Sequence, residues 1–357
     1  MKIGIVTQQL HNNYGGLLQN YALQYVLKKS GHNVKTIDYV FRLPVTKYIL
    51  STCKQIILGA IRFKKPNIHH YIAIPSLRKS IISQFVDIYI NKTKTVHSYN
   101  KNIIREEGFD IVITGSDQVW RPIYNYYIKD MYLEFVPDNV RKIAYAASFG
   151  VDSWEYTDKQ TQQCAKLAKK LNAISVREYS GIDHCRKFLG VEAKWVVDPT
   201  ILAGKEAYMP LIDKKYNDKY IFAYVLDQTP QKVRFINQIA KENGLDIRMH
   251  GSEKNATLSV EEWLSLIANS SIVITDSFHG TVFSILFHRE FYSIVNKARG
   301  GSRFFSLLKP LGLECRVGDV EEIETSQIQN IDWKHIDNVL QKQREDSMNF
   351  LINALIK

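Results

Sequence analysis

The feature that most constrains this chain is a short sequence, Ile-Val-Ile-Thr, that occurs at residues 111–114 and again at residues 272–275. Both copies are β-branched runs typical of buried parallel strands, and each is followed by a turn of small and polar residues and then by a helical pattern. Ligands of open α/β sheets bind outside the carboxyl ends of the strands. The chain is therefore predicted to hold two ligand-facing sheet edges, of which the second carries His279.

Strand and helix patterns alternate from the N-terminus, and the alternation starts again in the second half of the chain. The first strand and helix are predicted at residues 2–6 and 17–30, and the restart at residues 220–226 and 231–243. This alternation is typical of doubly wound α/β domains, and 357 residues exceed what one hydrophobic core normally covers. We therefore predict two α/β domains with a cleft between them.

The connecting sequence suggests the domain limits. Residues 203–218 contain glycine, proline and several charges, which is typical of an inter-domain connection. We predict an N-terminal domain over residues 1–202 and a C-terminal domain over residues 203–330. Apolar residues at helical spacing predict a terminal helix within residues 331–357.

The formal net charge of +11 is concentrated in one segment. Residues 41–105 contain twelve Lys or Arg residues and a single acid, Asp87, so the rest of the chain is neutral overall. Within this segment, residues 48–65 combine an apolar helical face with basic flanks, which is typical of a helix attracted to an anionic membrane. A core helix with a solvated basic face explains the pattern equally well. Nucleic acid is not an expected partner, because no nucleic-acid-binding motif accompanies the charge.

Several classes of protein are disfavoured by what the sequence lacks. No run approaches the roughly 20 apolar residues of a membrane span, and no secretory signal follows the first strand. The four cysteines show no C-x-x-C spacing, and no cluster of metal ligands is visible, so we expect no metal site. We expect a cytoplasmic protein that the basic segment would hold at the inner face of the plasma membrane.

His279 is the strongest candidate for chemistry. It lies at a predicted helix start directly after a strand, where free backbone N–H groups and the positive helix end favour an anionic ligand. Its imidazole could bind that anion or deliver a proton. The alternative is that this histidine only caps or packs against the helix.

Further cations follow two other predicted strands. Arg177 comes directly after the strand at residues 173–176, where a guanidinium could clamp a carboxylate or phosphate, or could pair with an acid such as Glu178. A glycine-rich run after the strand at residues 291–295 adds Lys297, Arg299 and Arg303. Such a run could approach a ligand closely or could be a plain turn.

The first strand-to-helix turn, residues 13–19, lacks the dinucleotide fingerprint, and the chain contains no Walker motif. This turn could still bind a hydroxylated substrate through Tyr14, Gln19 and Asn20.

The turn after the first Ile-Val-Ile-Thr copy contributes Asp117 and Trp120. Asp117 could act as a general base, and Trp120 could stack on a sugar ring. A helix N-cap for Asp117 and core packing for Trp120 are equally good interpretations.

Several short motifs, taken in order and spacing, resemble the polysaccharide pyruvyl transferase family. The similarity spans residue 3 to about residue 318, and the motifs are Gly15-Gly16, Ile113–Trp120, Tyr145–Gly150, Ser175–Glu178, Val197–Thr200, Asp276–Gly280 and Ser302–Leu308. The resemblance implies a GT-B-like fold, with two Rossmann-like domains and a final helix that crosses back to the first domain. It also implies transfer of pyruvate from phosphoenolpyruvate onto two hydroxyls of a sugar, as a cyclic ketal. The acceptor would be a glycan or a lipid-linked oligosaccharide, and no cofactor would be needed.

The resemblance also implies roles for particular residues. Donor contacts would come from Arg177 and from an Arg-Leu-His element that corresponds here to residues 277–279, followed by Gly280 and Thr281. This chain has Ser277 in place of the arginine, and our hypothesis is that Arg303, or else Arg299 or Lys297, replaces it. The donor-binding set is thus Arg177, Ser277, Phe278, Gly280, Thr281 and Arg303, and the acceptor-binding set is Tyr14, Gly15, Gly16, Gln19, Asn20 and Trp120.

The chemistry of this reaction suits two of the candidates. His279 would protonate the methylene carbon of phosphoenolpyruvate, and Asp117 would act as the base. Fold alone does not fix the reaction, so a GT-B glycosyltransferase that uses a nucleotide sugar is the main alternative. A non-catalytic protein that binds an anion or a glycan is a third.

Overall fold

The two Ile-Val-Ile-Thr copies form buried strands, β3 (Ile111–Thr114) and β9 (Ile272–Thr275), in two different parallel sheets. The computed structural model describes residues 1–11, 13–41, 81–251, 257–295, 300–323 and 330–356. The predicted basic helix at residues 48–65 and the candidate cations Lys297 and Arg299 lie outside these described residues.

The first sheet has six parallel strands in the order β2-β1-β3-β4-β5-β6. Its further strands are β1 (Lys2–Val6), β2 (Asn33–Thr36), β4 (Arg141–Ala147), β5 (Ala173–Val176) and β6 (Lys194–Trp195). Ile111 and Ile113 pack into one apolar core and Val112 packs into another on the opposite face. A strand covered on both faces reads as a continuous apolar run, which explains the sequence of β3.

The second sheet has five parallel strands in the order β11-β10-β9-β7-β8. Its further strands are β7 (Tyr220–Tyr224), β8 (Asp246–His250), β10 (Glu290–Ile294) and β11 (Val317–Gly318). In both sheets the first strand lies between the second and the third, and the repeated sequence is the third strand each time. The strand order therefore reverses beside β3 and beside β9, and a crevice for ligands is expected at such a point. Two doubly wound α/β sheets confirm the predicted fold class.

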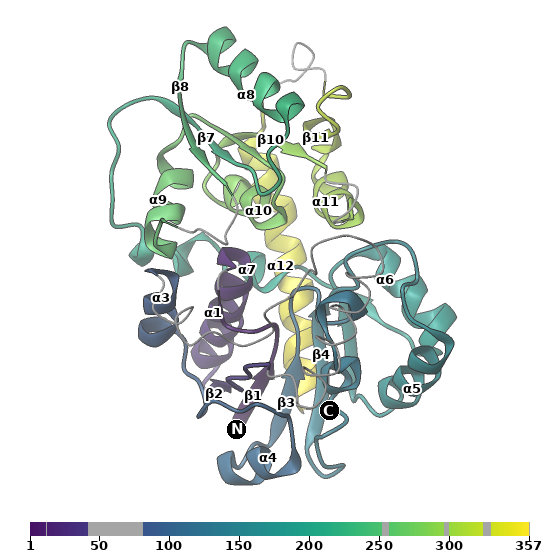
Figure 1. The fold of residues 1–357 in the computed structure, drawn as a ribbon. Helices are drawn as coiled ribbons and strands as arrows, with labels where there is room; N and C mark the ends of the chain where they lie inside the picture. The colour runs from purple at the N-terminus through teal and green to yellow at the C-terminus, as the bar shows by residue number, and fades with distance from the viewer. Residues whose placement is uncertain (12, 42–80, 252–256, 296–299, 324–329, 357) are drawn as a thin grey trace, which may run out of the picture.

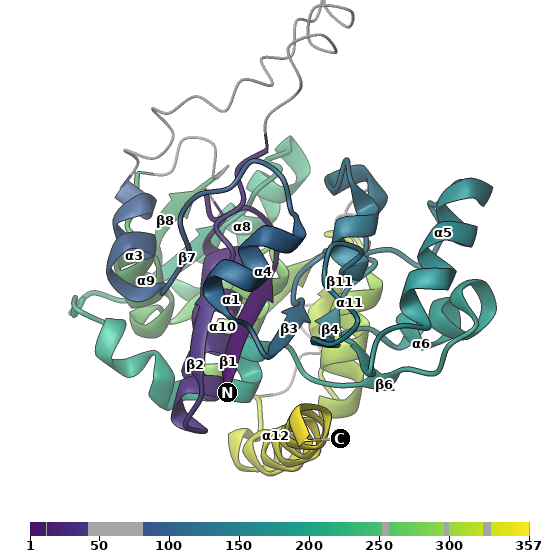
Figure 2. The same cartoon turned by 90° about the horizontal axis from the view of Figure 1, so that it is seen from below.

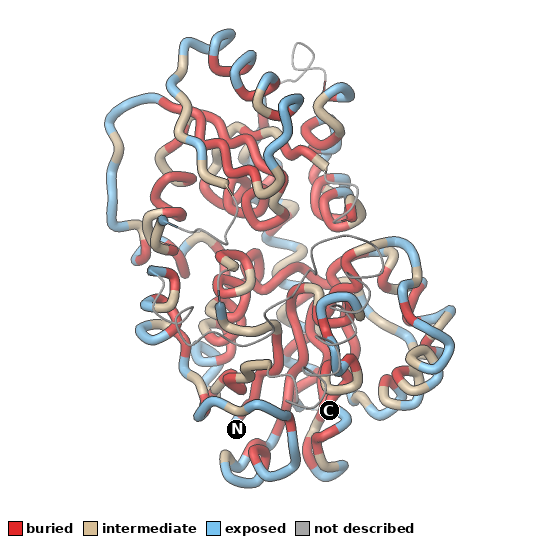
Figure 3. Tube along the Cα trace, in the orientation of Figure 1, coloured by how far each residue is buried: buried red, intermediate tan, exposed pale blue. Residues whose placement is uncertain are grey.

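Helices cover both sheets, and the strands between them are largely buried (Figures 1 and 3). The prediction missed several short elements, since a segment of nine residues or fewer carries little periodicity. The missed elements are β11, α3, α4, α6, α7 and α11. The helices are α1 (Tyr14–Lys29), α3 (Ile81–Tyr89), α4 (Lys101–Glu107), α5 (Asp158–Ala168), α6 (Tyr179–His184), α7 (Pro199–Ala203), α8 (Pro230–Asn243), α9 (Val260–Asn269), α10 (Phe278–Leu286), α11 (Ser302–Leu308) and α12 (Trp333–Ile356).

Helix α12 runs from the second sheet to the first, and it is seen nearly end-on beneath the first sheet in Figure 2. Near its start, Trp333 stacks on His288, with 4.9 Å between ring centroids. Near its end, the Ser347 hydroxyl accepts a hydrogen bond of 3.0 Å from the backbone N–H of Val197. The helix therefore fastens the two sheets to each other. None of the helices that the structure describes is both long and apolar enough to cross a membrane.

Two helices begin earlier than the sequence pattern predicts. The side chain of Asn13 accepts a hydrogen bond of 2.7 Å from the backbone N–H of Gly16, so α1 begins at Tyr14 rather than at Leu17. The side chain of Ser277 caps α10 in the same way, and that helix begins at Phe278. Gly15 and Gly16 thus lie in the first turn of a helix and not in a loop, which corrects the prediction for this turn.

Candidate active site at the domain interface

His279 is held between the two sheets, in the first turn of α10. A Cβ atom on Gly15 of α1 would overlap the imidazole, with Nδ1 as the nearest atom, so the ring lies directly on the backbone of the facing helix. On its other edge, Nε2 lies 3.8 Å from Oδ1 of Asp198, which is an ion-pair distance and not a hydrogen bond. His279 is 7% exposed, and Nε2 has no hydrogen-bond partner among the described residues.

Asp198 is the centre of a buried polar network at the carboxyl edge of the first sheet. Its Oδ2 accepts hydrogen bonds from Arg177 Nη1 at 2.6 Å and from the Ser116 hydroxyl at 2.9 Å. Its Oδ1 accepts from the hydroxyl and the backbone N–H of Thr200. Burial alone would raise the pKa of Asp198, but the neighbouring His279 and the charge of Arg177 lower that pKa below its ordinary value.

Arg177 and Arg303 lie against the same aromatic ring. Their guanidinium carbons are 4.6 Å and 5.8 Å from the ring centroid of Phe278, the residue that precedes His279. Both arginines are buried. Burial and the charge of Arg177 together lower the pKa of Arg303 to about 10. Two cations in one buried place are favourable only when negative groups face them.

Two carboxylates beside the arginines are held differently. Oδ1 of Asp117 lies 3.5 Å from Arg177 Nη2, so Asp117 contacts the arginine cluster, and no helix directly follows it to be capped. Oε1 of Glu178 instead accepts hydrogen bonds of 2.6 to 3.1 Å from Ser148 Oγ and from the backbone N–H groups of the next two residues, 149 and 150. Glu178 therefore fixes the turn after β4, while Arg177 pairs with aspartates. Arg177 Nε remains without a hydrogen-bond partner among the described residues.

The predicted acceptor residues do not form a polar surface in this structure. Tyr14 is fully buried, its ring stacks on Trp263 of α9 at 5.2 Å, and its hydroxyl donates to the Leu258 carbonyl at 2.9 Å. Trp120 is fully buried as well and stacks on Tyr132, with 4.7 Å between centroids. These contacts correct the two predictions: Tyr14 joins the domains, and Trp120 belongs to the core.

Gln19 and Asn20 are also buried and serve the framework. The Gln19 side chain donates to Thr7 and accepts from the backbone N–H of Ser116, so it supports the turn that follows β3. The Asn20 side-chain oxygen accepts from the Thr36 hydroxyl at 2.8 Å. Both side chains are fully buried, so in this structure neither is accessible to a sugar, which corrects both predictions.

The predicted donor residues behave in two ways. Phe278 and Arg303 lie in the cluster with Arg177, and Ser277 caps α10 beside it. Gly280 instead packs on Thr275, where a Cβ atom would come within 2.5 Å of a side-chain oxygen, and the Thr281 hydroxyl bonds Ser293 at 2.6 Å. Gly280 and Thr281 therefore shape the domain interior and do not line the cluster.

The sequence prediction missed Asp198 and Ser116 as site residues. Both follow strands of the first sheet, and that position was the available signal. The sequence around each residue does not distinguish it from an ordinary cap or turn residue, and Asp198 does cap α7.

The Asp198→Asn substitution is expected to destabilise the fold by about 3 to 5 kcal/mol at pH 7, because it leaves Arg177 buried with a weaker partner. Since the folded-state pKa of Asp198 is lowered, its stabilisation is complete above the unfolded-state pKa of about 4 and is lost as the pH falls below that value. Urea unfolding of both proteins across this range should show the difference shrink only below about pH 4. The exposed Asp183→Asn is the control, and equal stability of Asp198→Asn and wild type at pH 7 would contradict the network.

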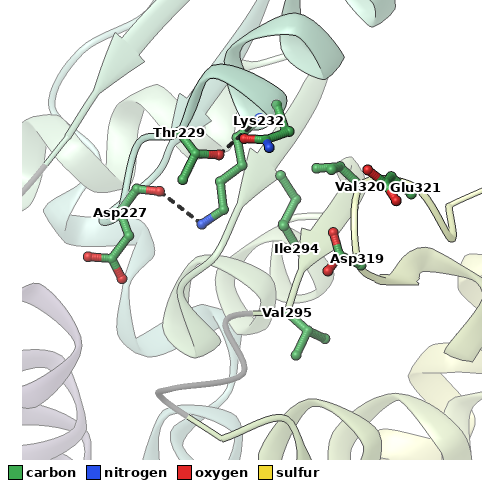
Figure 4. A pocket seen from close by; sticks show the side chains of 9 residues that line it. Asp227, Thr229, Lys232, Ile294, Val295, Asp319, Val320 and Glu321 are labelled. Carbon is green, nitrogen blue, oxygen red and sulfur yellow. Dashed lines mark hydrogen bonds between the residues drawn. The ribbon is translucent and has the colours of Figure 1, made fainter.

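The C-terminal domain also contains a pocket of about 370 Å³ at the carboxyl ends of β7, β10 and β11 (Figure 4). Three of its lining residues, Asp227, Asp319 and Glu321, are acidic. Its lysine, Lys232, donates from Nζ to the Asp227 carbonyl at 2.9 Å and to Asp276 at 2.6 Å. The charge of this lysine is thus largely compensated from within the domain.

Comparison with solved structures shows the fold of this chain. UDP-GlcNAc 2-epimerase from Neisseria meningitidis, bound to UDP-GlcNAc, is similar with a TM-score of 0.50 and 9% identity, over 99% of this chain and 100% of that one. UDP-GlcNAc 2-epimerase from Methanocaldococcus jannaschii is similar with a TM-score of 0.50 and 10% identity, over 96% and 92% of the two chains. At such identities the likeness concerns the fold alone, which is GT-B-like.

Sequence comparison identifies the family. No curated protein gives a significant match to this chain. The family model described as polysaccharide pyruvyl transferase matches residues 13–297, a range that includes Arg177, Asp198 and His279. Since this match covers most of the chain, the protein belongs to the polysaccharide pyruvyl transferase family and is a transferase.

Proposed function

We propose that this protein transfers pyruvate from phosphoenolpyruvate onto two hydroxyls of one sugar in a cell-surface polysaccharide precursor. The observation that carries the proposal is the pair of buried guanidinium groups, Arg177 and Arg303, that both contact the ring of Phe278, next to His279. Phosphoenolpyruvate carries a carboxylate and a phosphate, and each is a natural partner for a guanidinium. Buried Arg177 Nε and His279 Nε2 would also gain the acceptor oxygens that the described residues do not give them.

Arg303 is the proposed replacement for the family arginine whose place Ser277 takes. Ser277 has a short side chain that is used to cap α10. Arg303 comes from α11 and reaches the same Phe278 ring that Arg177 contacts. Two cations would thus face the donor although the Arg-Leu-His element is altered.

The cluster suits the proposed chemistry. Protonation of the donor methylene carbon by His279 makes the neighbouring carbon electrophilic, and Asp198 faces the ring edge, where it would balance an imidazolium charge. A sugar hydroxyl then attacks that carbon and gives its proton to a base, for which Asp117 is proposed. Phosphate leaves with its bonding electron pair, and the second hydroxyl closes the ketal with loss of its own proton. Because His279 rests on Gly15, donor entry would require the two domains to separate.

A glycosyltransferase that uses a nucleotide sugar would need a binding site for a diphosphate. The pocket of Figure 4 offers three acidic residues and one lysine that already binds Asp276. Such a lining repels a diphosphate. The charge distribution therefore favours the pyruvyl donor at the arginine cluster.

The acceptor is proposed to be a glycan or a lipid-linked oligosaccharide, met at the cytoplasmic face of the plasma membrane. The basic segment at residues 41–105 supports this placement, because clustered Lys and Arg residues are attracted to anionic lipid. No cofactor or metal enters the proposed reaction.

The Arg303→Ala variant is expected to bind phosphoenolpyruvate roughly 10- to 100-fold more weakly, since a charge-assisted hydrogen bond is worth about 1.5 to 3 kcal/mol. Calorimetric titration measures the affinity directly. The control is Arg186→Ala, which removes a surface arginine whose side chain is 60% exposed. Unchanged affinity in Arg303→Ala would show that another group replaces the family arginine.

The function itself is tested by incubating the full chain with phosphoenolpyruvate and a panel of bacterial oligosaccharides. The proposal expects phosphate to be released only with a suitable acceptor, and the product mass to increase by one pyruvate less one water. Release of a nucleoside diphosphate from a nucleotide sugar, without any use of phosphoenolpyruvate, would overturn it.

A further inference from the structure

An exposed group of aromatic side chains follows the turn that carries Asp117. Tyr126, Tyr124 and Tyr127 are 58%, 48% and 41% exposed. Phe41 packs beside them, with its ring centroid 5.6 Å from that of Tyr126 and 6.2 Å from that of Tyr127. We call Phe41, Tyr124, Tyr126 and Tyr127 the aromatic platform. Exposed aromatic rings that contact one another are a common feature of binding surfaces.

A buried ion pair supports the platform at Tyr124. Arg121 is 5% exposed and makes a bidentate ion pair with Glu155, with both N···O distances at 3.0 Å. The same guanidinium lies 5.1 Å from the ring centroid of Tyr124, and its Nη1 is 3.5 Å from the Tyr124 hydroxyl. Tyr126 and Tyr127 meet edge to face at 4.8 Å. Rings held in this way lose little freedom when a ligand binds.

The platform is connected to the turn that carries Asp117. Arg121 Nη1 donates a hydrogen bond of 3.2 Å to the side chain of Gln118, the neighbour of Asp117. Since the same Nη1 lies 3.5 Å from the Tyr124 hydroxyl, Arg121 connects the platform to the turn that carries Asp117.

We infer that the aromatic platform binds a sugar ring of the acceptor glycan, next to the sugar that receives pyruvate; this rests on the proposed function. Tyrosine combines an apolar face, which suits the C–H face of a pyranose, with a hydroxyl that can bond sugar hydroxyls. Within residues 121–134, which carry the three tyrosines of the platform, the charges favour a neutral ligand over an anionic headgroup. The two cations of residues 121–134, Arg121 and Lys129, are paired with Glu155 and Glu134.

The test measures glycan binding without phosphoenolpyruvate, on a printed array of bacterial surface oligosaccharides probed with the full chain. Both rings are on the surface, so the Tyr126→Ala/Tyr127→Ala double variant should fold. It is expected to lose about tenfold or more in affinity, whereas the double Phe variant keeps most of it. Ile88→Ala, which truncates a side chain that is 68% exposed on α3, is the control.

A kinetic readout separates this inference from the proposed function. The double Ala variant should raise the KM for an oligosaccharide acceptor and leave the KM for phosphoenolpyruvate unchanged. Glycan binding through the platform without any pyruvyl transfer would uphold the inference and overturn the function. Pyruvyl transfer by the wild type, with an acceptor KM that the double Ala variant leaves unaltered, would uphold the function and overturn the inference. A change of oligomeric state in the double variant, with glycan binding intact, would identify the platform as a protein interface and also overturn the inference.

Discussion

The Gly15→Ala substitution is expected to lower kcat/KM by at least roughly 100-fold, because one added methyl group must displace either the His279 ring or the start of α1. Gly15 lies in the first turn of a helix in which most residues are buried, so the helix cannot move without disturbing the inter-domain contact of Tyr14. A displacement of about 1 Å at a reacting group commonly costs a hundredfold in rate. Steady-state kinetics of phosphate release measure the effect.

The control for this prediction, Gly31→Ala, adds the same methyl group at a position with open space around it. Gly31 has a φ of +82° and no atom within 4 Å of a built Cβ. Gly31→Ala should cost about 1 to 2 kcal/mol of unfolding free energy, because alanine disfavours this conformation, and should leave kcat/KM unchanged. Wild-type kinetics in Gly15→Ala would contradict the contact between His279 and α1 in the reacting enzyme.

The His279→Gln variant is expected to lose about 100- to 10,000-fold in kcat while phosphoenolpyruvate still binds. The loss is that of a general acid, and the retained binding follows from Arg177 and Arg303, which the substitution leaves in place. Phosphate release at saturating donor measures kcat, and calorimetry measures donor affinity.

His288→Gln is the matched control, since His288 is partly exposed and pairs with Asp337 on α12. Its kinetics should equal those of the wild type. If His279→Gln retained full kcat, the proton would have to come from another group, and the role proposed for His279 would fail.

The sequence predicted the fold well where the apolar pattern was long or repeated. The two Ile-Val-Ile-Thr runs led to both sheets because a strand buried on both faces has few alternatives. The limits of α1 and α10 were missed because a side-chain cap, from Asn13 and Ser277, decides where each helix begins. The 1–202 and 203–330 domain limits stay a prediction, since the core is continuous between the sheets.

The candidate site was predictable only for the residues that follow strands. Arg177, Asp117 and His279 converge because parallel strands bring their carboxyl ends to one edge of each sheet. The sequence does not predict where a side chain in the first turns of a helix points, because tertiary packing decides that direction. Tyr14 and Gln19 illustrate this: both have polar groups suited to a sugar, and both use them inside the protein.

The central claim is that the cluster of Arg177, Arg303 and His279 binds phosphoenolpyruvate, and thermal unfolding with candidate donors tests it most directly. At a ligand concentration of about 100 times Kd, a ligand of the native state adds about 2.7 kcal/mol of stability. The account predicts that phosphoenolpyruvate raises the Tm of the wild type, that the increase largely disappears in Arg303→Ala, and that it persists in Arg186→Ala. A Tm raised by nucleotide sugars and unmoved by phosphoenolpyruvate would contradict it.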